Sequence, residues 1–236
     1  MEGAIHHVTS RGDHRERIFD DDGDRRRFLR RYEDVAARYE WVPLSYCLMD
    51  NHVHLVLETP RCTLSEGCRD LFGHYAQRRN GRQDSVGHVF QGRYRNRLVQ
   101  NEAYFAQLLR YVALNPVKAK ACAVAEAWPW SSHRSLCAGE VNPLARSVRV
   151  AELLDLGERE PSQRYGALFE PGNPLEIQFG TEHPEDWRPT LEVLFVRGES
   201  AGLAAARAHG YTLAALAAYL GVHESTVSRR LRKNGA

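Results

Sequence analysis

Apolar and polar positions along the first half of the chain follow two different periods, and their order predicts the fold. Two-residue alternation and β-forming residues indicate strands at 5–9, 41–49, 52–58 and 89–99, and spacings of three and four residues indicate helices at 24–39, 63–79 and 101–114. Asp50-Asn51 is typical of a tight hairpin turn, and Asn115-Pro116 is expected to end the third helix. The order β-α-β-β-α-β-α predicts an α+β fold of the ferredoxin-like, split β-α-β kind, an antiparallel sheet with helices on one face.

The last part of the chain has a helical pattern of its own. Residues 213–231 indicate a helix, a turn containing Gly221 and a second helix. Apolar positions fall on one face, and four polar residues of the second helix are candidate DNA contacts: Ser225, Thr226, Arg229 and Arg230. This is the pattern of a small all-α helix-turn-helix whose second helix enters a DNA major groove.

Proline and charge divide the chain further. Six of the ten prolines lie between residues 140 and 198. Residues 1–140 carry a net charge of +3, residues 141–198 a net charge of −4 and residues 199–236 a net charge of +3. We therefore expect a first domain at 1–138, an acidic, proline-rich and partly helical connector at 139–198, and a helix-turn-helix at 199–236. Basic ends on either side of an acidic connector suit a chain that contacts nucleic acid.

Composition narrows the protein class. No apolar run approaches the roughly 20 residues of a membrane helix, and the first residues lack the basic start and apolar stretch of a signal peptide. The five cysteines are scattered without a Cys-x-x-Cys pair, which argues against a disulfide framework or a thiolate zinc site. We expect a cytoplasmic protein.

Four residues carry the candidate chemistry. His52 and His54, at i and i+2 of a predicted strand, project from the same face and make half of a metal site, although two unrelated surface histidines would give the same pattern. Tyr111 and Asn115, at i and i+4 of a predicted helix, also share a face. The amide oxygen of Asn115 is a candidate third ligand for Mg²⁺ or Mn²⁺.

Arginine is concentrated around the fourth predicted strand. Between residues 74 and 98 there are six arginines and one carboxylate, Asp84. Arg93, Arg95 and Arg97 alternate and would share one strand face. A solvated charged face is the ordinary reading of such a run, but the interleaved Phe90 and Tyr94 resemble a phosphate track with rings for base stacking.

Four motifs recur together, in this order, in one protein family. They are Met49-Asp-Asn-His-Val-His54, Gly87-His-Val-Phe-Gln-Gly-Arg-Tyr94, Arg110-Tyr-Val-Ala-Leu-Asn-Pro-Val-Lys-Ala119 and Trp128-Pro-Trp-Ser-Ser132. Over roughly residues 5–137 the chain resembles the single-tyrosine HUH transposases, and most closely the REP-associated tyrosine transposases (RAYT) of bacteria. The resemblance implies metal ligands at His52, His54 and Asn115 and a nucleophile at Tyr111. Some related transposases have glutamine in place of Asn115.

The resemblance implies a strand-transfer reaction on DNA. Tyr111 would attack the scissile phosphate beside Mg²⁺ or Mn²⁺ and form a 5′-phosphotyrosine, with the cation and Arg110 lowering the phenol pKa from its usual value of about 10. Single-stranded or hairpin DNA from repeated palindromic elements is the expected substrate, and the helix-turn-helix would dock on duplex DNA. Candidate DNA contacts in the first domain are Arg11, Arg78, Arg79, Arg93, Arg95 and Arg97. We expect a nucleoid-associated monomer or homodimer.

Two other functions fit the same sequence. The chain could be a non-catalytic, sequence-specific DNA-binding regulator, which the helix-turn-helix favours and the complete set of catalytic residues disfavours. It could also be a metal-dependent nuclease that uses water, with Asp50 or Glu58 as the base.

Overall fold

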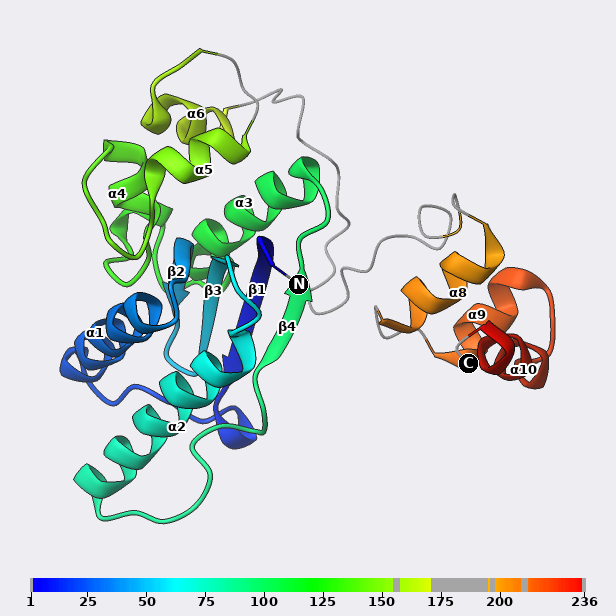
Figure 1. Ribbon diagram of the computed structural model, residues 1–236. Helices are drawn as coiled ribbons and strands as arrows, with labels where there is room; N and C mark the ends of the chain where they lie inside the picture. Colours follow the sequence, from blue (N-terminus) through cyan, green and yellow to red (C-terminus); the bar gives the residue numbers. More distant parts are fainter. Residues whose placement is uncertain (1, 155–157, 171–194, 196–197, 209–211, 235–236) are drawn as a thin grey trace. The chain divides into compact units, whose positions relative to one another are not determined.

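A four-stranded antiparallel sheet forms the centre of the first part of the molecule (Figure 1). The computed structural model describes residues 2–154, 158–170, 195, 198–208 and 212–234, in two compact units, Met1–Gln178 and Phe179–Ala236. In the first unit the strand order is β2-β3-β1-β4. The strands are β1 (Ala4–Arg11), β2 (Val42–Leu48), β3 (His52–Thr59) and β4 (Arg95–Leu98). The predicted α+β class and antiparallel sheet are confirmed.

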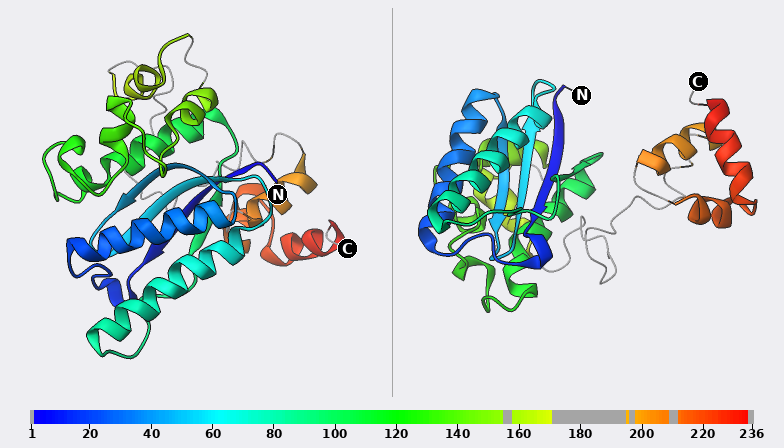
Figure 2. Two further views of the ribbon diagram at one scale, coloured as in Figure 1. Left: turned by 60° about the vertical axis from the view of Figure 1, so that its left-hand side comes forward. Right: turned by 90° about the horizontal axis from the view of Figure 1, so that it is seen from below.

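The sheet carries helices on both faces. Val8 of β1 lies opposite Leu55 of β3, so the two side chains share a face. That face packs against α1 (Asp22–Arg38) and α2 (Leu64–Gln83), which lie side by side (Figure 2), through buried side chains such as Phe28 and Leu71. The third helix, α3 (Glu102–Lys118), packs on the opposite face, where the ring of Tyr111 meets that of His54.

The prediction of helices on one face is therefore wrong for α3. Most of β1, β2 and β3 is buried, including residues of both alternating sets. A sheet buried on both faces needs a covering layer on each side, and α3 supplies the second.

Two element boundaries also differ from the sequence pattern. The helix α3 continues through Pro116 to Lys118, because a proline near the end of a helix removes only one ladder hydrogen bond and the following turn is closed by Ala119 N–H donating to the Asn115 carbonyl (3.0 Å). The fourth strand is shorter than the predicted 89–99. Phe90 makes an isolated bridge with Gly12 and packs on Phe72, and the chain then leaves the sheet until residue 95.

The Trp128–Ser132 segment covers the outer edge of β2. The Leu48 N–H donates to the Trp130 carbonyl (2.8 Å), and the Ser132 N–H donates to the Tyr46 carbonyl (3.0 Å). The Ser132 hydroxyl is fully buried and accepts from the Tyr46 N–H (3.0 Å). This pairing satisfies strand groups that an open edge would leave exposed.

Short helices complete the first unit. They are η1 (Asp13–Arg15), η2 (Ala125–Ala127), α4 (His133–Ala138), α5 (Ser147–Leu153) and α6 (Pro161–Ala167). The helices α5 and α6 pack against each other, α6 against α4, and α5 against β2. Residues 155–157, 171–194 and 196–197 of the expected connector lie outside the described residues, and the division at 138 and 198 stays a prediction.

The described residues of the second unit form the helices α8 (Glu199–Ala208), α9 (Leu213–Leu220) and α10 (Glu224–Asn234). Their buried core is made of Leu203, Ala206, Leu216, Ala217 and Val227. The Thr212 hydroxyl accepts from the Ala215 N–H (3.1 Å) at the start of α9. Gly221 ends α9 with φ +63°, a backbone conformation that favours glycine and turns the chain into α10. Among the helices described in both units, none has the length and apolarity to span a membrane.

Candidate active site

His52 and His54 lie on the sheet face that α3 covers. Within β3 they are two residues apart, and their rings, with centroids 5.0 Å apart, stand nearly perpendicular at 89°. His54 is buried and His52 is half-buried. Val53 between them points to the opposite face and packs in the core with α1 and α2. The alternation of one strand therefore places both imidazoles in the same layer.

Tyr111 and Asn115 reach this layer from α3. The helix begins at Asn101, whose side chain accepts from the Tyr104 N–H (2.8 Å), and buried Leu108 and Val112 hold the helix against the unit. This packing turns the face that carries residues 111 and 115 toward β3. Both side chains are buried, at 6% and 7% exposure, which is low for groups of their polarity.

The side-chain amide of Asn115 contacts the other three candidate residues. The Asn115 Nδ2 donates to the Tyr111 Oη (2.8 Å) and lies 3.3 Å from the His54 Nε2, while the Asn115 Oδ1 lies 3.2 Å from the His52 Nε2. The rings of His54 and Tyr111 meet edge to face at 5.2 Å. The structure thus brings together all four residues that the sequence singled out for chemistry.

Two further residues, His7 and Asn51, support the histidines. His7 of β1 stacks on His54 with ring centroids 5.2 Å apart, and its Nε2 lies 3.0 Å from the His54 Nδ1. Burial and, to a smaller extent, the Arg97 guanidinium lower the pKa of His7 to about 3, so this imidazole is neutral at neutral pH. Asn51 places its Oδ1 2.7 Å from the His52 Nδ1 and donates from its Nδ2 to the Arg15 carbonyl (2.9 Å).

The ligand chemistry of this set fits a divalent cation. The amide of Asn51 is oriented by its bond to a carbonyl, so its oxygen accepts from the Nδ1–H of His52 and leaves the His52 Nε2 with a lone pair. That lone pair faces the Asn115 Oδ1 at 3.2 Å, which places two acceptors against each other. A cation between them would satisfy both atoms. Among the described residues no group of three or more His, Cys, Asp or Glu could hold a metal. This candidate site therefore depends on the Asn115 amide oxygen as its third metal ligand.

Comparison with known proteins identifies the family. The family described as "Transposase IS200 like" matches residues 2–115. Residues 2–115 of this chain, just under half of its length, are therefore similar to that family. The region that matches contains every side chain of the site described above.

A solved structure has the same fold. It is described as a REP-associated tyrosine transposase bound to a REP hairpin, it is 16% identical, and it superposes with a TM-score of 0.50 over 61% of this chain and 85% of that one. The resemblance inferred from the sequence motifs is thus confirmed at the level of family and fold. No curated protein sequence matches the chain significantly.

Three of the predicted DNA-contacting arginines lie on the sheet face that holds His52 and His54. Arg11 of β1 lies directly opposite His52 of β3. On the other side of β1, the strand β4 places Arg95 opposite Thr9 and Arg97 opposite His7. Cross-strand partners share a face, so these arginines surround the histidines. Arg93 precedes β4 and is exposed, so it does not continue this row.

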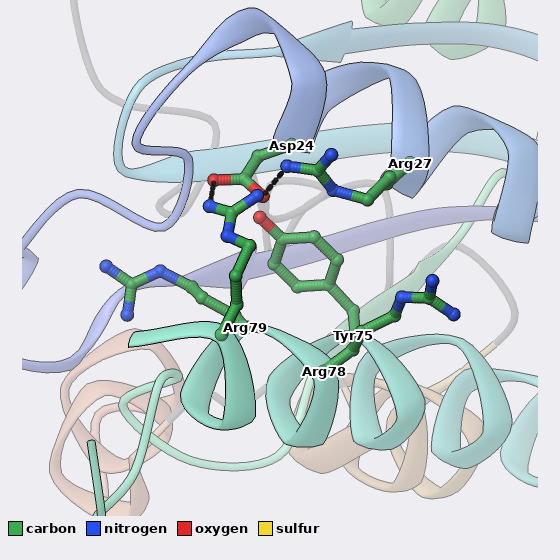
Figure 3. A pocket seen from close by; sticks show the side chains of 6 residues that line it. Asp24, Arg27, Tyr75, Arg78 and Arg79 are labelled. Atoms are coloured by element: carbon green, nitrogen blue, oxygen red, sulfur yellow. Dashed lines mark hydrogen bonds and ion pairs between the residues drawn. The ribbon is translucent and has the colours of Figure 1, made fainter. Parts of the chain in front are cut away.

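Arg78 and Arg79 belong to the other side of the sheet. They lie on α2 and line a pocket of about 220 Å³ between α1 and α2, in which arginines from both helices surround Tyr75 (Figure 3). Arg79 is paired with Asp20 (2.9 Å), and the buried Asp24 pairs with Arg27 (2.9 Å). Tertiary structure thus divides the arginines of residues 74–98 between two faces.

Arg110, which was expected to act on Tyr111, also contacts the segment that follows α6. Its guanidinium donates to the Leu168 carbonyl and lies over the ring of Phe169 at 5.9 Å, so it ties α3 to the segment after α6. A cation that contacts Tyr111 is Lys118, whose Nζ lies 5.3 Å from the ring centroid. The spacing of 111, 115 and 118 on one helix is the sequence signal that identifies it.

The four predicted contacts of the C-terminal unit lie on α10. Ser225 and Arg229 are exposed, and Thr226 is partly exposed. The Ser225 hydroxyl lies 2.9 Å from the His223 Nδ1, and Arg230 pairs with Glu199 of α8 (2.6 Å). Arg229 is therefore the more accessible arginine of the pair.

Proposed function

We propose that this protein cuts and joins single-stranded DNA through a covalent 5′-phosphotyrosine on Tyr111, with Mg²⁺ or Mn²⁺ as cofactor. The observation that carries the proposal is the convergence of the phenol, two imidazoles and the Asn115 amide on one buried face. A phenol alone is a weak nucleophile at neutral pH, and it needs neighbours that orient it and stabilise negative charge.

Asn115 supplies both effects to the phenol. Its Nδ2 donates to the Tyr111 Oη at 2.8 Å, which fixes the direction of the oxygen and stabilises the charge that grows as the proton leaves. Lys118, over the same ring, adds positive charge nearby. His52, His54 and the Asn115 Oδ1 would hold the cation, which when bound neutralises the scissile phosphate.

The proposed cleavage step balances without an external energy source. The Tyr111 Oη forms a bond to phosphorus, and the bond from phosphorus to the leaving 3′ oxygen breaks. The phenol proton goes to solvent and the leaving oxygen takes one up, giving a 3′-OH end and a 5′-phosphotyrosine. A different 3′-OH then attacks the same phosphorus and releases Tyr111, so one phosphodiester replaces another.

We infer a hairpin or single-stranded substrate from the repeated palindromic class. The support is the fold shared with a transposase whose structure is described as bound to a REP hairpin. Arg11, Arg95 and Arg97 lie on the sheet face that holds Tyr111, where they suit the phosphates of the cleaved strand. Arg78 and Arg93 are exposed elsewhere, where they suit the rest of the DNA, and Arg79 is committed to Asp20.

The C-terminal unit is proposed to dock on duplex DNA as a helix-turn-helix. The helices α9 and α10 are joined by only three residues, and α10 presents Ser225, Thr226 and Arg229 at its surface. Arg230 would contribute only if its ion pair with Glu199 opened. Under this proposal the protein works in the cytoplasm at the nucleoid, as a monomer or homodimer.

The water-using nuclease is the weaker alternative because both nearby carboxylates are engaged. Asp50 pairs with Arg25 and, at 3.4 Å, with Arg17. Glu58 receives two hydrogen bonds from Arg149, of 2.8 and 3.0 Å. A carboxylate whose oxygens accept from an arginine is poorly placed to accept a proton from an attacking water as well.

Covalent capture tests the proposal. A hairpin oligonucleotide labelled at its 3′ end and incubated with Mn²⁺ should become attached to the protein and survive on a denaturing gel, and EDTA should prevent this. Tyr111→Phe should bind the same hairpin with an unchanged Kd and give no adduct. Tyr104→Phe, on the same helix, is the matched control and should give the adduct.

Two results would contradict the proposal. An adduct that persists in Tyr111→Phe would show that Tyr111 is not the nucleophile. Strand cutting without any adduct selects the water-using nuclease, and hairpin binding without cutting by the wild type selects the non-catalytic regulator.

A further inference from the structure

Two hydrogen-bonding partners of the candidate metal ligands, His7 and Asn51, take no direct part in the proposed chemistry. His7 comes from β1 and Asn51 from the β2–β3 turn, and each faces the Nδ1 of a different histidine. In both cases the Nε2 atom of the same ring faces Asn115. The two contacts therefore have the same arrangement, although they come from different parts of the chain.

We propose that Asn51 and His7 are positioning residues that fix the tautomers of His52 and His54, so that both Nε2 atoms present lone pairs to one cation. The inference rests on the proposed metal site. A neutral imidazole has one N–H and one lone pair, and the partner of one nitrogen decides which atom carries the proton. Outer hydrogen bonds of this kind orient metal-bound histidines in general.

The Asn51 contact sets the first tautomer. Its Nδ2 donates to the Arg15 carbonyl at 2.9 Å, so its oxygen is the atom that faces His52. An amide oxygen can only accept, and the 2.7 Å separation therefore places the proton of His52 on Nδ1. The Nε2 of His52 is left as a lone pair directed at Asn115.

The His7 contact can set the second tautomer in the same way. The His7 Nε2 and the His54 Nδ1 lie 3.0 Å apart, and one proton lies between them. Both side chains are at least 95% buried, at 3% and 5% exposure, and their rings are stacked, so the pair is held in place. If His7 accepts, the His54 Nε2 is also a lone pair.

The resulting arrangement cannot be satisfied by the Asn115 amide alone. As placed, its oxygen faces the lone pair of His52 and its nitrogen donates toward His54. Exchanging the oxygen and nitrogen transfers the conflict to His54, whose Nε2 then meets the oxygen. If both outer partners accept, the His52 Nε2, the His54 Nε2 and the Asn115 oxygen are three acceptor atoms around one position. They then form a cation site in either orientation of the amide.

Nitrogen-detected NMR on the metal-free full-length protein tests the tautomers directly. In the wild type both His52 and His54 should be protonated at Nδ1. His7→Phe keeps a ring against His54 but cannot accept, and Asn51→Leu removes the acceptor of His52. Each variant should shift its own histidine toward a mixture with the Nε2–H form and leave the other unchanged.

Mn²⁺ affinity, measured by electron paramagnetic resonance without DNA, is the second readout. Each variant should weaken binding by about 10- to 100-fold, the usual effect of losing an outer hydrogen bond at a metal site. Asn51→Asp restores an acceptor and should recover most of the affinity. His88→Phe, an exposed histidine elsewhere, is the control and should change nothing.

The outcomes separate this inference from the proposed function. Wild-type tautomers and Mn²⁺ affinity in both His7→Phe and Asn51→Leu would overturn the inference and leave the covalent chemistry of Tyr111 intact. Absence of Mn²⁺ binding by the wild type would overturn the proposed metal site itself. If one variant fails to fold, the other still decides the result for its own histidine.

Discussion

The Asn115 amide nitrogen donates a 2.8 Å hydrogen bond to the Tyr111 phenol oxygen, one helical turn earlier. The oxygen of the same amide lies 3.2 Å from the His52 Nε2. One side chain therefore connects the candidate nucleophile with the candidate metal ligands. Two atoms of one planar group serve two functions, and substitutions can separate them.

Asn115→Ala removes both contacts and should slow adduct formation by about 10²-fold or more, the scale of losing one preorganised polar group at a reacting centre. Asn115→Asp keeps an oxygen ligand but loses the N–H donor to Tyr111, so it should retain Mn²⁺ affinity and still react slowly. Single-turnover adduct formation and Mn²⁺ titration together check this. A wild-type rate in Asn115→Ala would show that the amide is dispensable.

Arg95 should contribute to DNA affinity through phosphate. It is exposed on the β4 position opposite Thr9, on the catalytic face. Arg95→Ala should weaken hairpin binding and reduce the slope of log Kd against log salt by about 0.7 to 1, the effect of one lost phosphate contact. Arg69→Ala removes an equally exposed charge from α2 on the other face and serves as the control. Equal salt slopes in the two variants would place the DNA elsewhere.

Gly67 on α2 is required by a close contact with Trp41. A Cβ at this position would lie 2.1 Å from the Trp41 Cζ2, and the indole is held by its Nε1 donating to the Thr63 hydroxyl (3.1 Å). Gly67→Ala should lower the free energy of unfolding by about 1–3 kcal/mol through overpacking. Gly73→Ala, on the same helix with nothing within 4 Å, should instead raise it by about 0.5–1 kcal/mol. Urea denaturation of both variants measures the contrast.

His133 should make stability depend on pH. Burial lowers the pKa of this histidine below its usual 6.5, despite an opposing hydrogen bond from its side chain to Glu126. The unfolded chain then binds more protons than the folded chain below about pH 6.5, so stability is full above that pH and falls as the pH decreases.

The size of this dependence can be measured with EDTA present, which keeps the candidate ligands His52 and His54 free of metal. A buried histidine whose pKa is lowered, such as His133, changes the free energy of unfolding by up to about 1.4 kcal/mol per pH unit. His133→Gln should show a shallower loss between pH 7 and pH 5.5 than the wild type. An equal slope in both proteins would mean that His133 protonates without cost in the folded state.

Local spacing determined much of the candidate site. The i, i+2 spacing of His52 and His54 needs only a strand, and the i, i+4 spacing of Tyr111 and Asn115 needs only a helix. Both elements are present, so each pair shares a face as predicted. The order of strands and helices, and with it the α+β class, followed from the same short-range periodicities.

Contacts between distant segments could not be predicted in this way. Which face α3 covers, which residue of β1 lies beside His54, and how the arginines divide between two faces all depend on strand register and on packing of the whole sheet. His7 and Asn51 carry no local signal for their role, because the atoms that they contact belong to other residues whose ring orientation is set by tertiary structure.

The sequence by itself thus determined the chemical groups and their pairing within each element. Only the tertiary structure decided that the two pairs meet, and which neutral partners surround them. The physical reason is that periodicity fixes the direction of a side chain relative to its own backbone, whereas burial of the apolar faces fixes where that backbone lies relative to the others.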